Sequence, residues 1–580
     1  MSGGPLERRA SKLVAAGRTD EALQGLYARL RSHPGGDELR DLASALATTY
    51  SSTLRSRQAD RSQRRLALSC WLMAGDPRSA LRLSKGLSLD AARCHRALGE
   101  HDKEGQCYIE GGWPAHGAFA MERVGDLEAA RTLWERVIED TQGNSYIRGL
   151  AFFNLHRVLR GLEDQEGAAL AASSCFQNLE AAAAGFERSR LRERAFDCYL
   201  VLLRAGAEGS FENLAEGYVG ALRVLAADGL RNFVLQYFAD FQEEALRRGE
   251  FHAAAAAFRE GAQYCRRHGL PYADHFLRQG ARAHRAAGDA LARMEGQAEL
   301  AENAYAASLE LHAELGLFPE VEALYARLAE LPLPDARIAR YRRLGARLAG
   351  VPEATGAVFV EVPTHLRNEQ AYPDVWRLDI LEWEQKGDPA EAMGDIAFSS
   401  EWPDNVRSKA FACRLLAHEA EASPAVEQTV AVARALGGSD VYGALAPLEH
   451  LYATDQVPVR IACLEATQEL FFKRTFGLVR RGLEDPDGQV RNRALGALKR
   501  LHFNHACDSL TRIYGESTDP ETRLTALSSL GRIATEDAVD VLIEASRHGS
   551  RRERELAREC LGKHTRSELV ARIRSATASP

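Results

Sequence analysis

The sequence has few aromatic residues, few lysines and no long apolar run. Aromatic residues make up 7% of the 580 residues, whereas alanine, leucine and arginine recur throughout, a mixture that favours helices packed through small side chains. Only 8 of the 74 basic residues are lysines, which indicates a GC-rich bacterial genome rather than selection for arginine chemistry. No stretch approaches the roughly 18 consecutive apolar residues of a membrane span, so we expect no transmembrane segment.

Paired cysteines and a secretion signal are also missing. The ten cysteines occur singly, without a Cys-x-x-Cys pair, and several occupy apolar positions of expected helices. This pattern predicts reduced core residues. Residues 1–9 carry charge but no apolar run follows them, so we expect no signal peptide. Together these features predict a cytoplasmic protein.

The formal net charge of −7 is concentrated in one segment. Residues 351–439 contain 7 basic and 15 acidic side chains, whereas residues 1–350 contain 46 of each and residues 440–580 contain 21 and 20. No region therefore has the basic excess that phosphate-dominated binding needs. Nucleic acid is accordingly a poor candidate for the partner.

Motifs of catalysis and cofactor binding are absent from the sequence. It contains no phosphate-binding loop, no Gly-x-Ser-x-Gly, no His-Glu-x-x-His and no glycine-rich dinucleotide turn. Cys94, His101, Cys107 and His116 have no compact zinc-finger spacing, so we interpret them as packing or surface residues. We expect neither an enzyme nor a bound metal or cofactor.

One short signature recurs in the C-terminal part of the chain. Its clearest copy is residues 487–498, DGQVRNRALGAL. The copies can be aligned on the position directly before the arginine. The intervals between successive copies are then 31, 53, 31, 32 and 31 residues, and the aligned residues are Val375, Val406, Val459, Val490, Thr522 and Glu553. A near-constant period in this range predicts stacked helix pairs, each too small to bury its apolar face alone.

These units resemble HEAT repeats, of the short kind also found in phycobilin-lyase-like proteins. The resemblance is specific over residues 455–561 and weaker over 374–416, where Trp376 replaces the arginine. The 53-residue step is 22 residues longer than its 31-residue neighbours. Since this is about one helix and a turn, we predict one enlarged unit near 423–452.

The N-terminal 350 residues show almost unbroken helical periodicity with a recurring turn. In the segments that begin at Gly17, Gly75, Gly125 and Gly249, alanine follows five residues after the glycine, and Trp134 or Phe258 follows in two of them. This resembles the second half of tetratricopeptide repeats. The turns lie 58, 50 and 124 residues apart, whereas that family repeats at about 34 residues, so degenerate repeats or inserted helices are expected between them.

The sequence therefore predicts an all-α solenoid in three parts. Residues 1–350 form a tetratricopeptide-like array, residues 351–372 a junction with a short β-branched run, and residues 373–580 a HEAT-like array. A basic cluster at 55–65, beside Ser51 and Ser56, is interpreted as a solvated loop.

The recurring arginines of the signature have a structural interpretation. We predict that each bonds the acid or the carbonyls of the preceding turn; Asp487 and Asp519 each lie four residues before an arginine. A row of ligand-binding side chains is the alternative. The arginines are Arg407, Arg460, Arg491, Arg523 and Arg554.

The candidate partner-binding residues lie in the HEAT-like array. Half of the six tryptophans, Trp376, Trp383 and Trp402, fall within 27 residues of the acidic segment, where they could anchor a partner with a basic segment or pack the junction. Later second helices carry more arginine, including Arg474, Arg481 and Arg512.

The function predicted from these features is a protein-binding scaffold, adaptor or regulatory subunit. Its partner is another protein or peptide, held on the concave surface that the second helices line. Two alternatives stay open. One is nucleic-acid binding through the later arginines, and the other is a lyase-like activity suggested by the repeat subtype.

Overall fold

The computed structural model describes residues 4–54, 61–189, 191–207, 209–227, 230–352, 396–399, 402–422 and 425–578. Within these ranges every regular element is a helix and none is a strand, which confirms the predicted all-α solenoid class. The chain divides into two compact units, each built from an earlier and a later segment. Unit 1 is Met1–Ala182 with Ala371–Ile533, and unit 2 is Ala183–Gln370 with Ala534–Pro580.

Unit 1 contains most of the C-terminal repeats together with the N-terminal helices. Its first segment has α1 (Pro5–Ala15), α2 (Thr19–Leu30), α3 (Gly36–Thr53), α4 (Arg61–Met73), α5 (Pro77–Leu83), α6 (Ser88–Leu98), α7 (His101–Glu110), α8 (Pro114–Val124), α9 (Leu127–Asp140) and α10 (Ser145–Gly161). Its second segment has α22 (Asp404–Ala422), α23 (Val426–Gly438), η2 (Tyr442–Ala444), α24 (Leu445–Tyr452), α25 (Val457–Thr467), α26 (Thr475–Leu483), α27 (Gly488–Arg500), η3 (Asn504–Ala506), α28 (Cys507–Glu516) and α29 (Pro520–Leu530). The boundary with unit 2 falls within α11 (Gln165–Arg188).

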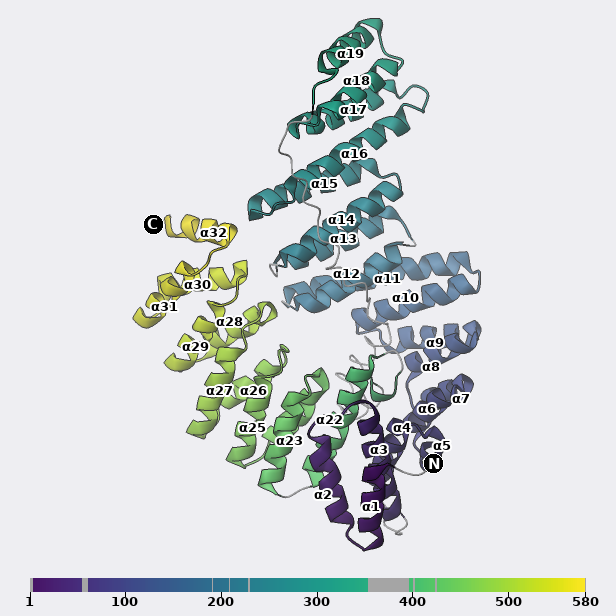
Figure 1. The fold of residues 1–580 in the computed structure, drawn as a ribbon, viewed down its shortest axis with the longest axis vertical. Coiled ribbons are helices and arrows are strands. Elements are labelled where there is room, and N and C mark those ends of the chain that lie inside the picture. Colours follow the sequence, from purple (N-terminus) through teal and green to yellow (C-terminus); the bar gives the residue numbers. More distant parts are fainter. Residues whose placement is uncertain are drawn as a thin grey trace. The chain divides into compact units, whose positions relative to one another are not determined.

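Unit 2 begins with a run of longer helices that pack in sequence order, coloured blue to teal in Figure 1. They are α12 (Arg192–Ala207), α13 (Phe211–Ala227), α14 (Arg231–Arg247), α15 (Phe251–His268), α16 (Ala273–Leu291), α17 (Ala298–Glu314), α18 (Phe318–Glu330) and α19 (Asp335–Leu348). The last three helices of the chain are α30 (Glu536–His548), α31 (Arg551–Gly562) and α32 (Ser567–Ala578).

The recurring glycine turn of the N-terminal segments has the predicted structural role. Gly17, Gly75, Gly125 and Gly249 all have a positive φ, between 76° and 82°, a conformation that glycine adopts without the penalty of a Cβ atom. The alanines five residues later are at most 3% exposed. Trp134 and Phe258 are also buried, so the small residue and the aromatic residue both pack against neighbouring helices.

The signature helices of the C-terminal repeats form one layer of unit 1 and the second helices form another. α25 and α27 pack against each other, as do α27 and α29, while α26 packs on α25, α27 and α24. The signature explains this arrangement because its apolar positions, for example Val490, Ala494 and Leu498, are fully buried. The unit that begins with the second copy of the signature contains three α-helices: α22, which carries that copy, followed by α23 and α24.

The core of unit 1 joins residues that are far apart in sequence. One apolar cluster contains buried residues of α1–α6, among them Leu42 and Leu46, and buried residues of the repeats, among them Phe411 and Val459. α22 packs against both α2 and α4. The predicted junction at 351–372 lies outside the described residues except for its first two positions.

Candidate functional site

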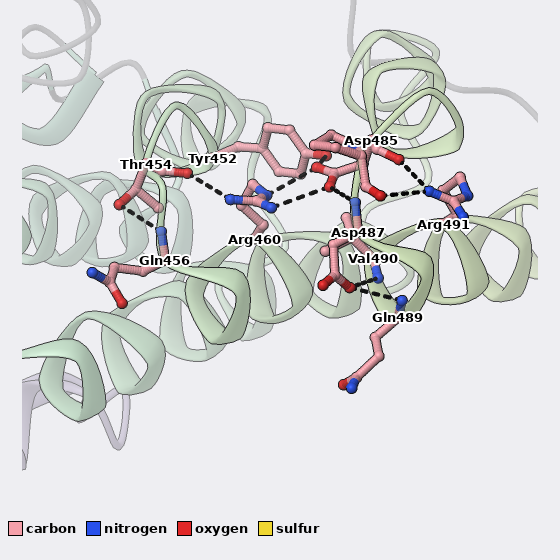
Figure 2. Close-up of polar contacts among 10 residues, drawn as sticks. Tyr452, Thr454, Gln456, Arg460, Asp485, Asp487, Gln489, Val490 and Arg491 are labelled. Atoms are coloured by element: carbon pink, nitrogen blue, oxygen red, sulfur yellow. Dashed lines mark hydrogen bonds and ion pairs between the residues drawn. The ribbon is translucent and has the colours of Figure 1, made fainter.

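The signature arginines bond the preceding turns, as predicted. Figure 2 shows Arg460 between Thr454 and Asp485: it donates to the Thr454 carbonyl at 3.0 Å and to the two Asp485 carboxylate oxygens at 2.9 and 3.1 Å. On the other side of Asp485, Arg491 donates to the main-chain carbonyls of Asp485 and Pro486 at 2.7 and 2.8 Å. These hydrogen bonds link one repeat to the next.

The other signature arginines make equivalent contacts. Arg407 donates to the Ala397 carbonyl at 3.3 Å, Arg523 to the Tyr514 carbonyl at 2.6 Å and Arg554 to the Gly549 carbonyl at 2.8 Å. The predicted acids have a different role: Asp487 and Asp519 cap their helices by accepting hydrogen bonds from main-chain N–H groups of the first turn. The row is therefore structural and does not form a ligand site.

Asp485 is the centre of the polar network in Figure 2. Besides Arg460, its carboxylate accepts the Tyr452 hydroxyl at 2.7 Å and the Asp487 N–H at 2.9 Å. Burial would raise the pKa of Asp485, but the hydrogen bonds from Asp487, Tyr452 and Arg460 outweigh it and hold the pKa below its ordinary value. The Asp485 carboxylate is therefore ionised at neutral pH, and both of its oxygens accept hydrogen bonds.

Ion pairs connect the second helices to one another. Arg474 pairs with Glu449 of α24 at 2.8 Å, Lys473 pairs with Asp508 of α28 at 2.7 Å, and Arg480 of α26 pairs with Glu516. The carboxylates on this layer are thus shared between neighbouring helices. We call α24, α26 and α28, with the segment 468–474 that precedes α26, the second-helix surface.

Two arginines and one phenylalanine of this surface remain available to a partner. Arg512 is exposed and makes no ion pair with any residue that the structure describes. Arg481 is exposed, with its guanidinium carbon 5.1 Å from the centre of the Tyr452 ring. Phe471 is 53% exposed and packs edge-on against Phe503 at 6.3 Å. The surface therefore combines positive charge with an exposed aromatic ring.

The arginines of this surface were candidates in the sequence, whereas Phe471 was not. Phe471 and Phe472 are adjacent in a loop, followed directly by Lys473 and Arg474. Phe472 packs against the core of unit 1, whereas Phe471 is exposed. Two successive phenylalanines outside a helical period are the signal that could have found it, because neighbouring residues of a loop rarely share the same burial.

The tryptophan site is only partly described. Trp402 is half-buried and packs against the core of unit 1. Trp376 and Trp383 lie outside the described residues. Their grouping with Trp402 stays a prediction.

The described part of the basic cluster, and Ser51 beside it, have structural roles. In the basic cluster, Arg55 and Arg57 lie outside the described residues, but Arg65 pairs with buried Asp90 at 2.9 Å. Ser51, expected in a loop, is in helix α3 and accepts a hydrogen bond from Trp71 Nε1 at 3.0 Å. This part of the cluster is therefore an anchored helix rather than a solvated loop.

The cysteine and histidine candidates also pack within the fold. His101 bonds Glu104 at 2.8 Å, and the His116 ring lies 5.2 Å from the Tyr108 ring. Nine of the ten cysteines are buried, Cys107 is intermediate, and all ten are free thiols. Burial, with the nearby charge of Asp90, raises the pKa of Cys94 to about 12, which keeps this thiol protonated.

No group of histidine, cysteine and acidic residues able to hold a metal ion occurs in the described part of the chain. Among the same residues, no helix has both the length and the apolar character needed to cross a membrane.

Comparisons with known proteins identify the repeats. Residues 478–562 match the family model of HEAT repeats. None of the curated proteins matches the chain in sequence. Similar solved structures include a chain of Naa15/Naa10 bound to HypK-THB, with 13% identity over 99% of this chain and 96% of that one and a TM-score of 0.20. The pentatricopeptide repeat protein PPR10 from maize has 13% identity over 99% and 95%, with a TM-score of 0.19.

Proposed function

We propose that this helical-repeat protein, which contains HEAT repeats over residues 478–562, is a non-catalytic scaffold or adaptor that binds another protein through its second-helix surface. Stacked helix pairs offer an extended surface without a closed catalytic pocket, and such repeats commonly bind through it. The arginines predicted from the sequence, Arg474, Arg481 and Arg512, all belong to this surface. The ion pairing and exposure of these arginines indicate which kind of partner segment the second-helix surface can bind.

The observation that carries the proposal is the distribution of charge on the second-helix surface. Its acids Glu449, Asp508 and Glu516 are each held in an ion pair with a basic residue of the same surface, and its fourth acid, Glu469, pairs with Arg500 of α27 at 3.1 Å. Arg481 and Arg512 are left exposed and pair with none of these acids. Guanidinium groups bind carboxylates by paired hydrogen bonds, so we expect the partner segment to be acidic.

The aromatic ring completes the proposed recognition. Phe471 offers an apolar contact at the edge of the same surface, and buried aromatic side chains contribute strongly to protein interfaces. A partner segment with carboxylates flanking an apolar side chain fits these groups. Charge complementarity would set the register and the association rate, while Phe471 would slow dissociation.

A quantitative pull-down from cells that encode the protein tests the proposal. The variant F471A/R481E/R512E is compared with the wild type and with the control L300A/R340E/R342E, which changes one exposed leucine and two exposed arginines of α17 and α19. We expect the first variant to lose one specific protein by about tenfold or more. The control should retain it, and circular dichroism should show equal helicity.

Three results would redirect the proposal. Equal recovery of every protein by both variants would remove the second-helix surface as the binding site. Loss of the partner only in the triple alanine variant of Trp376, Trp383 and Trp402 would move the site to the acidic segment and favour a partner with a basic segment. A shift of duplex DNA at low salt that R481E/R512E abolishes would replace the protein partner by nucleic acid.

A further inference from the structure

Helix α19 has an excess of positive charge that the regional charge balance hides. Residues 335–348 contain five arginines and one acid, Asp335, although residues 1–350 contain 46 basic and 46 acidic side chains. All five arginines are exposed, and no residue of the helix is buried. α19 follows α18 at the end of the run of long helices in unit 2 (Figure 1). One short element therefore presents this charge to solvent.

One side of α19 is held against an apolar core of unit 2. Ile338 and Tyr341 pack against a cluster of buried residues that belong to α17, α18 and the segment after α18. At Gly345 the helix comes close to α18, since a Cβ atom there would lie 3.3 Å from the Tyr325 Cβ atom. None of the large apolar side chains of α19 is exposed. The solvent side of the helix is accordingly polar.

Three arginines share the solvent side of the helix. Arg340, Arg343 and Arg347 follow one another at intervals of three and four residues, so they lie on one face and span roughly 10 Å. None of the three forms an ion pair with a residue that the structure describes, and Arg343 donates to a carbonyl of its own helix at 3.3 Å. Arg337, by contrast, pairs with an acid of α17 at 2.9 Å. We call Arg340, Arg343 and Arg347 the arginine face; Arg342 lies outside it.

We propose that the arginine face binds the phosphate backbone of duplex DNA without reading its sequence. Duplex DNA carries one negative charge per about 1.7 Å of its axis, so a face of roughly 10 Å meets several phosphates. Guanidinium groups bind phosphate oxygens by paired hydrogen bonds. This site goes beyond the protein partner proposed above and uses no residue of the second-helix surface.

The composition of the arginine face favours duplex DNA over other anions. Protein interfaces have apolar and aromatic side chains at their centre, and helices that lie on membranes insert an apolar side into the lipid. α19 exposes no large apolar side chain that could serve either purpose. Single strands are commonly held by stacking on aromatic rings, but the Tyr341 ring is stacked within unit 2, 6.2 Å from the Tyr325 ring. Charge is what remains, and charge dominates binding to a duplex backbone.

Fluorescence anisotropy of the full chain with a labelled DNA duplex of about 20 base pairs tests the site, between about 50 and 200 mM salt. We expect the wild type to bind duplexes of different sequence equally well. The variant R340Q/R343Q/R347Q should bind about tenfold or more weakly at the lowest salt. Each neutralised phosphate contributes about −0.9 to the slope of log K against log salt, so the variant's slope should be shallower by about 2 to 3.

The control R551Q/R552Q/R558Q removes the same charge from three exposed positions of α31. Acids alternate with arginines on that helix, so we expect the control to bind within about twofold of the wild type. No binding by the wild type, unchanged binding by R340Q/R343Q/R347Q, or equal weakening in the control would overturn the proposal.

Two further variants separate charge from folding. R340K/R343K/R347K keeps the charge and should bind within about threefold of the wild type; a loss as large as that of the glutamine variant would contradict an electrostatic site. Circular dichroism should show equal helicity for all variants. Should R340Q/R343Q/R347Q fail to fold, R340Q/R347Q decides, with a slope that we expect to be shallower by about 2. An unchanged slope would then contradict the proposal.

Two other polyanions complete the test. Poly-glutamate represents an acidic protein segment, and vesicles that contain phosphatidylserine represent an anionic membrane. We expect both to bind the wild type more weakly than the duplex does. Tighter binding of either one, lost in R340Q/R343Q/R347Q, would replace DNA by an acidic protein or by a membrane surface.

Discussion

An acid, a tyrosine and an arginine meet repeatedly at the contacts between neighbouring helices. The carboxylate accepts a hydrogen bond from the tyrosine hydroxyl and forms an ion pair with the arginine, so each of the three side chains has a polar partner. Burial followed by the hydrogen bond to the acid raises the tyrosine pKa, for Tyr305 to about 12. The triads are Asp485 with Tyr452 and Arg460, Asp289 with Tyr305 and Arg327, Glu302 with Tyr341 and Arg337, and Glu187 with Tyr199 and Arg223.

Asp485 should contribute to stability only while it is ionised. Because its folded-state pKa is depressed, this contribution is present above the unfolded pKa of about 4 and disappears as the pH falls through the lower folded value. We expect Asp485→Asn to lower the free energy of unfolding by about 2 to 4 kcal/mol at pH 7. Urea unfolding at pH 7, 4 and 2.5 checks this; a difference from the wild type that stays constant with pH would refute the ionic role.

Arg491 should act on stability before it acts on binding. Arg491→Glu removes two hydrogen bonds to the carbonyls of Asp485 and Pro486, which we expect to cost about 1 to 2 kcal/mol in the free energy of unfolding. Arg512→Glu, at an exposed arginine of the neighbouring α28, should cost under about 0.5 kcal/mol. Chemical denaturation of both variants measures the contrast. A stable R491E protein that has lost only its partner would contradict the structural role.

The signature arginines could be interpreted from sequence because their spacing relative to the turn is constant. The identity of their acceptors could not. Arg460 bonds Asp485, which lies 25 residues later in the next repeat, whereas Asp487 turns its carboxylate to the N–H groups of its own helix. An aspartate before a helix can either pair with an arginine of another repeat or cap its own helix. Helix capping is the local interaction and requires less ordering of the chain.

At the scale of helices, close approach depends on small residues. Gly437, in the last turn of α23, faces α25, and a Cβ atom there would lie 2.7 Å from the Ala466 Cα atom. We expect Gly437→Ala to destabilise unit 1 by about 1 to 3 kcal/mol. The matched variant is Gly496→Ala in α27, where the nearest atom to the added Cβ would be 3.8 Å away; it should stabilise by about 0.5 to 1 kcal/mol. Thermal unfolding of the pair should show shifts of opposite sign, and shifts of equal sign would contradict this account of the packing.

Helix ends in the N-terminal segments were predictable where glycine marks them. Gly75 and Gly125 have a left-handed conformation, and each is followed by an aspartate that caps the next helix. Asp76 accepts a hydrogen bond from the Ser79 N–H, and Asp126 accepts one from the Ala129 N–H. The end of α3 was not predictable. Ser51 is polar and close to a basic stretch, but a tertiary contact, the hydrogen bond from Trp71, keeps it within the helix.

At the scale of the molecule, the composition of unit 1 is the feature that sequence periodicity did not reveal. Arg31 pairs with Glu419, and His33 bonds the Ala435 carbonyl at 3.0 Å, across 388 and 402 residues of chain. Repeat patterns report contacts between neighbouring helices only. They carry no information on which distant segments share a core, so this association could not be predicted from them.

Glu419 should couple the N-terminal helices of unit 1 to its repeats. Its side chain is 3% exposed and that of Arg31 is 21% exposed, so Glu419→Gln leaves a half-buried guanidinium without its counter-charge. We expect hydrogen exchange to accelerate together in α2 and in α22. The control Glu38→Gln breaks the exposed pair with Arg29 and should change exchange only near α2 and α3. Acceleration in α22 alone would show that the two segments open independently.

Site-specific photo-crosslinking in cells tests the central claim, that the second-helix surface holds a protein partner. The photoreactive residue p-benzoylphenylalanine is placed at Arg512 of this surface and, as a control, at Arg342, which is also exposed and lies on α19. Short-range crosslinking captures only molecules in contact with the substituted position. We expect one discrete crosslinked protein from position 512, which is lost when Arg481 is also changed to Glu, and none from position 342. The same products from both positions, or none from either, would contradict it.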